Sequence, residues 1–315
     1  MDLATSSPHA IHTNYEDALV LRNVTKRFGD FVAVDDLSLN IPKGSIYGFL
    51  GPNGAGKTTT IRMVMSIFYP DSGTISVLGH PDSERIKDRL GYLPEEKGLY
   101  KKMKTAEIVA YFGKLKGMDA STAKIKAREM LTQYGLGDWL DKKCETMSKG
   151  MGQKVQLLGT LIHDPELVIL DEPFSGLDPV NMEVMRDTIR SFKKDNRTVI
   201  FSTHVMAQAE ELCDFIFLID KGKKIIDGPL REVRSTGDHG LKIDYDGDGS
   251  ILHQLSGVAR INDAGKSAEL FLEEGTEPQD ILKQIVDKLV IRKFDISEPS
   301  LHEIFVRAVG GETDE

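Results

Sequence analysis

The spacing of apolar residues divides the chain into predicted strands and helices. Leu19–Val24 and Val32–Leu39 alternate apolar and polar positions, which is typical of strands with one buried face. Ile46–Leu50 and Leu167–Leu170 are almost continuously apolar and predict fully buried strands. Helical spacing follows the second of these runs over Asn181–Lys193. Because strands alternate with helices in this way, we expect an α/β fold with a mostly parallel sheet.

Two regions depart from this alternation. Residues 80–150 are rich in lysine and have helical spacing over Ala106–Lys116 and Thr122–Tyr134, which predicts a helical insertion. After Gly228-Pro229 the pattern reads strand, helix, strand, strand, helix, strand and a final helix, an order compatible with a ferredoxin-like βαββαβ unit. We therefore expect a loose tail over residues 1–18, a main domain over 19–235 with the insertion at about 92–150, and a small α+β domain over 236–315.

Composition limits the classes of function. The chain has 315 residues and a formal net charge of −9, and this acidic balance argues against a broad nucleic-acid-binding face, which needs a basic stripe. Cys144 and Cys213 have neither metal nor disulfide spacing and fit a reducing cytoplasm. No apolar run approaches the ~18 residues of a membrane helix, and the N-terminus lacks the features of a signal peptide. We therefore expect any membrane role to come through a partner.

A glycine-rich turn, GPNGAGKTT, follows the predicted strand Ile46–Leu50 and precedes a helix-like stretch. Its glycines allow the backbone to approach phosphate oxygens because they carry no Cβ. Lys57 is suited to contact the β- and γ-phosphates, and the Thr58 hydroxyl is suited to hold Mg²⁺. The unpaired N–H groups at the start of the helix would face the same anion. The turn therefore predicts binding of a nucleoside triphosphate.

Two carboxylates follow a second buried strand. The run Val168-Ile-Leu ends in Asp171 and Glu172. Asp171 is placed to bind Mg²⁺ directly or through water, and Glu172 lies where a carboxylate could polarise an attacking water. Because this pair follows a phosphate-binding turn by about a hundred residues in a parallel-sheet context, it predicts hydrolysis of the nucleotide.

A second anion site is predicted before the helix-like run Gln153–Ile162. In the preceding segment, Met147–Met151, Ser148 and Gly150 would present a hydroxyl and a backbone N–H at a helix N-terminus. One chain does not need two phosphate sites for one nucleotide. Two copies that face each other do, because the second site of each can close over the γ-phosphate held by the other.

These motifs together resemble those of the ATP-binding cassette (ABC) transporter ATPase subunits, over roughly residues 19–230. The resemblance implies a Walker A loop at Gly51–Thr58 and a Walker B strand at Leu167–Asp171. It also implies that Glu172 is the catalytic glutamate and that His204 is the switch histidine that senses the γ-phosphate. The implied cofactors are ATP and Mg²⁺.

The resemblance assigns the remaining site residues. Phe28 falls where the family stacks an aromatic ring on adenine, the alternative being a core aromatic. The residues assigned to the nucleotide are Phe28, Gly51, Pro52, Asn53, Gly54, Ala55, Gly56, Lys57, Thr58 and Thr59. The signature motif, which contacts the ATP of the opposing subunit, comprises Ser148, Lys149, Gly150 and Met151. The D-loop, which contacts that subunit, comprises Ser175, Gly176, Leu177 and Asp178.

Two positions depart from the family pattern. Glu95 stands where the family usually has the Q-loop glutamine, so it offers an oxygen to Mg²⁺ but cannot donate a hydrogen bond while ionised. The metal ligands implied are therefore Thr58, Asp171 and Glu95. The signature reads MSKGM, in which Lys149 replaces a glycine and Met151 a glutamine. Lys149 either adds positive charge near the γ-phosphate or points to solvent.

The motifs GYLPEEKGLY and DEPFSGLDPVN and the ending of the chain resemble exporter-type ATPases of the sodium- and drug-efflux kind. This resemblance implies an ATP-hydrolysing subunit that dimerises with a copy or a paralogue and powers a separate transmembrane permease. It implies a cytoplasmic location on the inner face of the membrane, and no nucleic-acid partner.

Two other functions are compatible with the sequence. One is a soluble ABC-type ATPase that acts on DNA or the ribosome, although such proteins usually carry two cassettes or a long coiled-coil insertion. The other is a regulatory module in which ATP only switches partner contacts, against which the presence of Glu172 and His204 argues.

Overall fold

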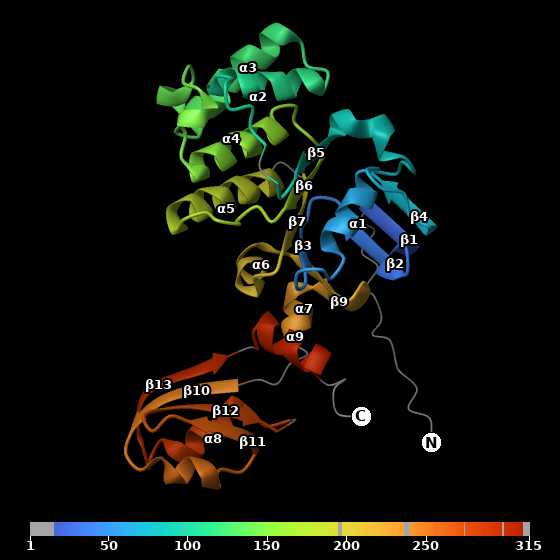
Figure 1. Cartoon of the computed structure of the whole chain (residues 1–315). Helices are drawn as coiled ribbons and strands as arrows, with labels where there is room; N and C mark the ends of the chain where they lie inside the picture. Colours follow the sequence, from blue (N-terminus) through green and yellow to red (C-terminus); the bar gives the residue numbers. More distant parts are fainter. Residues whose placement is uncertain are drawn as a thin grey trace. The chain divides into compact units, whose positions relative to one another are not determined.

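The computed structural model describes residues 16–96, 98–194, 197–235, 240–273, 275–297 and 299–310, in two compact units. The first unit comprises residues 1–204 and 219–224, and the second comprises residues 205–218 and 225–315. Figure 1 gives the course of the chain through both. Most of the tail expected over residues 1–18 lies outside the described residues.

The first unit contains a three-stranded antiparallel sheet in the order β2-β1-β4. Its strands are β1 (Asp17–Phe28), β2 (Phe31–Pro42) and β4 (Ser72–Val77). β1 continues beyond its predicted end at Val24. The alternation of apolar and polar residues stops there because the pairing with β2 is irregular, and Asn23 has a φ of +49°. Leu19, Leu21 and Val24 nevertheless form its buried face, as the sequence pattern predicts.

A parallel sheet forms the centre of this unit. β3 (Ile46–Leu50), β5 (Leu90–Leu93), β6 (Leu167–Asp171) and β7 (Thr198–Thr203) pair in parallel in the order β5-β6-β7-β3. β8 (Phe215–Asp220) and β9 (Lys223–Pro229), whose residues 219–224 belong to this unit, complete the six-stranded order. β3 and β6 are buried throughout, as expected for strands covered on both faces. The predicted α/β fold with a parallel core is confirmed.

The predicted helical insertion is also present. It contains α2 (Thr105–Leu115), α3 (Ala120–Gln133) and the start of α4 (Lys149–Leu161), with short 3₁₀ turns η2 (Gly137–Trp139) and η3 (Cys144–Thr146). The helices share a core that includes Val109, Ala127, Leu131, Val155 and Leu158. Gly159 of α4 allows close packing, because a Cβ at this position would lie 2.5 Å from the Phe112 ring of α2. Figure 1 shows these helices grouped beside α5 (Pro179–Lys194).

Two further helical segments flank the central sheet. α1 (Lys57–Val64) follows β3, and the 3₁₀ segment η1 (Ser83–Arg89) precedes β5. None of the described helices is long and apolar enough to span a membrane.

The second unit contains a four-stranded antiparallel sheet in the order β11-β12-β10-β13. Its elements are α6 (Met206–Leu212), α7 (Leu230–Ser235), β10 (Gly240–Asp246), η4 (Gly249–Gln254), β11 (Val258–Asp263), β12 (Ser267–Leu272), α8 (Pro278–Ile285), β13 (Val290–Ser297) and α9 (Leu301–Gly310). Strand order and directions match the predicted ferredoxin-like unit. The first predicted helix, residues 251–256, is a short 3₁₀ segment instead, which places Leu252 in the core with Ile281 and Ile285 of α8.

Candidate functional site

The glycine-rich loop connects β3 to α1 under tight steric constraint. A Cβ on Gly51, which has a φ of +153°, would lie 2.2 Å from the carbonyl oxygen of Ile219. A Cβ on Gly56, with a φ of +109°, would lie 2.5 Å from the carbonyl oxygen of Ala33. Only glycine fits both positions, so the loop is held between two neighbouring backbones immediately before α1 begins.

Lys57 is a buried cation inside this loop. Only 6% of the residue is exposed, and its ammonium donates to the carbonyl oxygens of Gly51 (2.7 Å) and Pro52 (3.0 Å). Burial lowers the pKa of Lys57, and three carboxylates oppose this shift, in decreasing order Glu172, Asp171 and Glu95. The nearest of these, Glu172, has its Oε1 at 4.0 Å from Nζ. The site therefore favours an added anion beside Lys57, which would further stabilise the charged ammonium.

The acidic residues are held by the neighbouring strand. β6 and β7 pair with Asp171 opposite Ser202. The Ser202 hydroxyl donates to Asp171 Oδ1 (2.5 Å) and accepts from the backbone N–H of Glu172 (3.0 Å). Glu172 has a φ of +48°, a conformation that is strained for a residue with a side chain. Ser202 thus fixes one carboxylate through its side chain and the next through its backbone.

His204 completes this group. It follows β7 by one residue, and its Nδ1 lies 2.9 Å from Glu172 Oε1. The same carboxylate oxygen therefore faces the imidazole on one side and the Lys57 ammonium on the other. The residues expected at the site from three separate segments meet at the carboxyl ends of β3, β6 and β7.

The oxygen atoms near Thr58 fit a magnesium ion. The Thr58 hydroxyl lies 3.4 Å from Asp171 Oδ1, and Asp171 Oδ2 is buried without a hydrogen-bond partner among the described residues. A buried carboxylate oxygen without a donor is costly unless a cation binds it. A threonine hydroxyl and a carboxylate are ligands that Mg²⁺ accepts alongside phosphate oxygens. The chemistry of these groups therefore fits the ion.

The signature and D-loop residues form a second group. Ser148 caps α4 by accepting from the N–H of Met151 (3.3 Å), so the helix starts four residues before its predicted beginning. Asp178 caps α5 in the same manner, and its bonds from Asn181 lower the pKa of the Asp178 carboxyl. The Lys149 side chain is exposed, and its end lies against Gly176: a Cβ there would be 2.1 Å from Nζ.

Phe28 and Glu95 lie at the edges of the site residues. Phe28 ends β1 and is 46% exposed, with its ring edge-to-face with Phe68 at 5.6 Å between centroids. The ring is thus partly accessible to solvent, with Lys26 Nζ 5.6 Å from its centroid. Glu95 is exposed just after β5, and its charge reaches Lys57, as the effect on the lysine pKa indicates.

Two residues that the motifs did not single out connect these parts. Ser202 bridges Asp171 and Glu172, and Asn181 donates to Asp178 through both its backbone and its side chain. A serine next to the end of a buried strand with an apolar centre was the available signal for Ser202. Asn181 ends the motif DEPFSGLDPVN and bonds Asp178 locally, but its contact with Gly150 depends on how α4 and α5 pack.

Known proteins resemble the chain along nearly its whole length. The ABC transporter family matches residues 34–175, and the family described as ATP-binding protein DrrA1-3-like, C-terminal domain, matches residues 228–309. The uncharacterized ABC transporter ATP-binding protein YhaQ of Bacillus subtilis is 41% identical over 293 residues, which cover 93% of this chain and 98% of that protein. The daunorubicin/doxorubicin resistance ATP-binding protein DrrA of Streptomyces peucetius is 30% identical over 325 residues, covering 97% and 96%.

The fold is similarly represented among solved structures. One described as the ATP binding subunit of an ABC transporter matches with a TM-score of 0.64 and 26% identity. The match covers 70% of this chain and 92% of the solved one.

The role of Ser202 can be tested by stability. Ser202→Ala leaves the buried Glu172 N–H without its acceptor, so we expect the free energy of unfolding to fall by about 1–3 kcal/mol, measured by denaturant titration. Ser191→Ala is the control, because its hydroxyl bonds a helix carbonyl (Thr188, 2.7 Å) away from the site. Its effect should stay below about 0.5 kcal/mol. Equal losses in both variants would contradict the bridging role.

Proposed function

The chain belongs to the ABC transporter ATP-binding proteins, which bind and hydrolyse ATP, and on this premise we propose that it powers export through a separate membrane subunit. The observation that carries the catalytic part is the meeting of Lys57, Asp171 and Glu172 at one edge of the parallel sheet. Export, as the direction of transport, is inferred from the drug-resistance relative and from the matched C-terminal family.

In the proposed reaction, the loop residues bind the triphosphate. Backbone N–H groups of the loop and the start of α1 face the phosphates, and the Lys57 ammonium exchanges its bonds to Gly51 and Pro52 for phosphate oxygens. The proposed nucleotide contacts are Phe28, Gly51, Pro52, Asn53, Gly54, Ala55, Gly56, Lys57, Thr58 and Thr59. Phe28 is assigned to the adenine because its ring is partly exposed at the end of β1.

Glu172 and His204 are proposed to act on the γ-phosphate. The Glu172 carboxylate accepts a hydrogen bond from the attacking water and orients it toward phosphorus, and the products are ADP and inorganic phosphate. His204 lies 2.9 Å from the same carboxylate, which supports a role in holding it and in contacting the transferred group. Mg²⁺, held by Thr58 and Asp171 with Glu95 at the edge, would neutralise charge on the phosphates.

Two copies are proposed to enclose two ATP molecules. Ser148, Lys149, Gly150 and Met151 of one copy would face the nucleotide on the Walker A loop of the other, with Ser175, Gly176, Leu177 and Asp178 along the contact. The capped start of α4 supports this assignment, because its N–H groups favour an anion. The second copy is the same chain or a paralogue. Because ATP bridges the two surfaces, the dimer forms with ATP and opens after hydrolysis.

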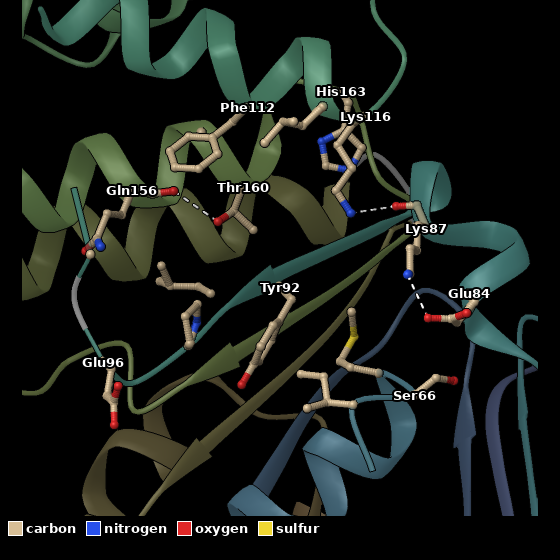
Figure 2. A pocket seen from close by; sticks show the side chains of 17 residues that line it. Ser66, Glu84, Lys87, Tyr92, Glu96, Phe112, Lys116, Gln156, Thr160 and His163 are labelled. Atoms are coloured by element: carbon tan, nitrogen blue, oxygen red, sulfur yellow. Dashed lines mark hydrogen bonds and ion pairs between the residues drawn. The ribbon is translucent and has the colours of Figure 1, made fainter. Parts of the chain in front are cut away.

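A cavity of about 550 Å³ in the first unit is the proposed docking site for the permease. It lies between the helical insertion and the region around β5, and Figure 2 shows Tyr92, Phe112 and His163 among its lining side chains. The lining is largely apolar, and the charged groups along one wall are already bonded: Lys116 donates to the carbonyls of Lys87 and Leu90, and Lys87 pairs with Glu84. Ile67 and Leu115 line it while 53% and 63% exposed, which suits an apolar segment of a partner.

The domain boundaries and location follow from the same proposal. We assign residues 19–235 to the ATPase and 236–315 to an accessory domain, and we place the chain in the cytoplasm, on the inner membrane face through its permease. A soluble ATPase acting on DNA or the ribosome is the alternative, and the net charge of −9 argues against a nucleic-acid partner.

Glu172→Gln tests the proposed dimer in which two copies enclose two ATP molecules, called here the ATP sandwich. The amide cannot accept the proton of the attacking water, so we expect turnover to fall by at least about 10²-fold and the variant to elute as a dimer with ATP–Mg²⁺ on gel filtration. The same variant should be monomeric with ADP. A variant that binds ATP and remains monomeric would argue strongly against the scheme.

Thr58→Val tests the metal assignment. The isosteric change removes the hydroxyl near Asp171, so the Mg²⁺ concentration for half-maximal turnover should rise by about tenfold, a difference of ~1.4 kcal/mol. Thr60→Val is the control, because the Thr60 hydroxyl donates to the Gly56 carbonyl within α1 (2.9 Å). An unchanged Mg²⁺ requirement in Thr58→Val would remove Thr58 from the ligand set.

Leu115→Glu tests the docking cavity. A charge on the lining should prevent an apolar partner segment from binding, since burying an unpaired carboxylate is unfavourable, while turnover and the ATP-dependent dimer persist. The measurement is sedimentation of the chain with membranes of the cells that make it. Ile125→Glu is the matched control, because Ile125 on α3 is 60% exposed and does not line the cavity. Equal membrane association of both variants would place the permease elsewhere.

A further inference from the structure

The start of α4 and the segment that follows Glu172 are interlocked within one chain. Gln153 of α4 is 2% exposed, and its side-chain amide donates to the carbonyl oxygen of Pro173. One turn earlier, the Lys149 side chain ends against Gly176. The signature motif and the D-loop therefore contact each other in the same subunit.

A second close contact between these segments involves Gly150 and Asn181. A Cβ on Gly150 would lie 2.5 Å from Asn181 Nδ2 and 2.8 Å from its Cγ, so the amide occupies the space that a side chain at residue 150 would need. The same Nδ2 donates to Asp178 Oδ2 at 2.6 Å, and the Asn181 backbone N–H donates to Asp178 Oδ1 at 2.9 Å. One amide thus contacts the signature motif and holds the carboxylate of the D-loop.

The D-loop is in turn connected to the catalytic glutamate. The N–H of Ser175 donates to the carbonyl oxygen of Glu172 (3.1 Å), and the N–H of Leu177 donates to that of Phe174 (3.2 Å). Gly150 is therefore connected to the backbone of Glu172 by a steric contact with Asn181, by the hydrogen bonds of Asn181 to Asp178, and by the turn over residues 172–178. A displacement of the signature motif has a direct mechanical route to the site of the same chain.

We propose that Asn181 is a positioning residue that makes the start of α4 and the D-loop move as one element. The inference rests on the proposed ATP sandwich, because it assigns a consequence to nucleotide contact at the signature motif. When the ATP of the opposing copy binds there, Asn181 carries the displacement to Asp178 and so sets the position of Glu172.

Asn181→Asp separates this role from simple space filling. Aspartate has the same shape but no N–H to donate, and its carboxylate would face that of Asp178. It also occupies the third position of α5, where a negative charge favours the helix. We therefore expect kcat to fall by about tenfold and KM for ATP to stay within about twofold, while the favourable helix charge offsets part of the stability lost to the facing carboxylates.

Asn181→Ala and a remote control complete the comparison. Alanine removes the donor without adding the repulsion, so its loss of kcat should be smaller than that of Asn181→Asp. Glu183→Gln changes an exposed charge on the same helix and should leave kcat within about twofold. A kcat for Asn181→Asp within about twofold of the parent, or a rise in KM for ATP as large as the fall in kcat, would overturn the proposal.

A stability cycle tests the interlock without turnover. Gly150→Ala should lower the melting temperature by at least about 2 °C more in the parent than in Asn181→Ala, because only the parent carries the amide that the new methyl group meets. Equal shifts in both backgrounds would overturn the interlock.

The Glu172→Gln dimer, measured in parallel, keeps the two proposals distinguishable. If that dimer forms while Asn181→Asp behaves like the parent, only the positioning role fails. If no ATP-dependent dimer forms although ATP binds, the sandwich fails, and the coupling built on it fails too. The contact between Gly150 and Asn181 is then tested separately, by the melting temperatures of Gly150→Ala in the two backgrounds.

Discussion

The parallel pairing of β6 with β7 is the constraint on which the site depends. Parallel strands end at the same edge of a sheet, so this register sets Asp171 beside Ser202 and leaves Glu172 and His204 to follow together. The pairing of β7 with β3 brings the phosphate loop to the same edge. Backbone pairing thereby brings Thr58 within hydrogen-bond distance of Asp171, more than a hundred positions away in the sequence, and the Ser202 side chain links the two neighbouring carboxylate residues to β7.

The second consequence of this arrangement is electrostatic. A buried ammonium lies among carboxylates that compensate it only in part, and one carboxylate oxygen has no donor among the described residues. Both features are unfavourable in the empty site. A magnesium–phosphate group would relieve them, since it supplies an anion to Lys57 and a cation to Asp171. The polar interior is thus arranged for a ligand and not for the stability of the empty protein.

The sequence was sufficient to predict those features of the fold and site that depend on short, local patterns. The phosphate loop, the acidic pair after β6 and the histidine after β7 each carry their own pattern, and strand alternation gave the core. It could not reach what depends on packing between elements. The irregular pairing near Asn23 hid the second half of β1, and Ser148 extended α4 backwards by a cap that only the folded backbone reveals. The Lys149 side chain is exposed, and the contact of its end with Gly176 of its own chain depends on the folded arrangement of the two segments.

Glu172 carries one further consequence, through its backbone. Its φ of +48° lies in the left-handed region, which glycine adopts readily and in which a residue with a Cβ is strained by about 1–3 kcal/mol. Substitution by glycine would relieve the backbone but would also remove the carboxylate that partly compensates the buried Lys57 and contacts His204, so the two effects on folding oppose each other. The backbone strain at this turn is therefore the cost of placing one carboxylate against both Lys57 and His204.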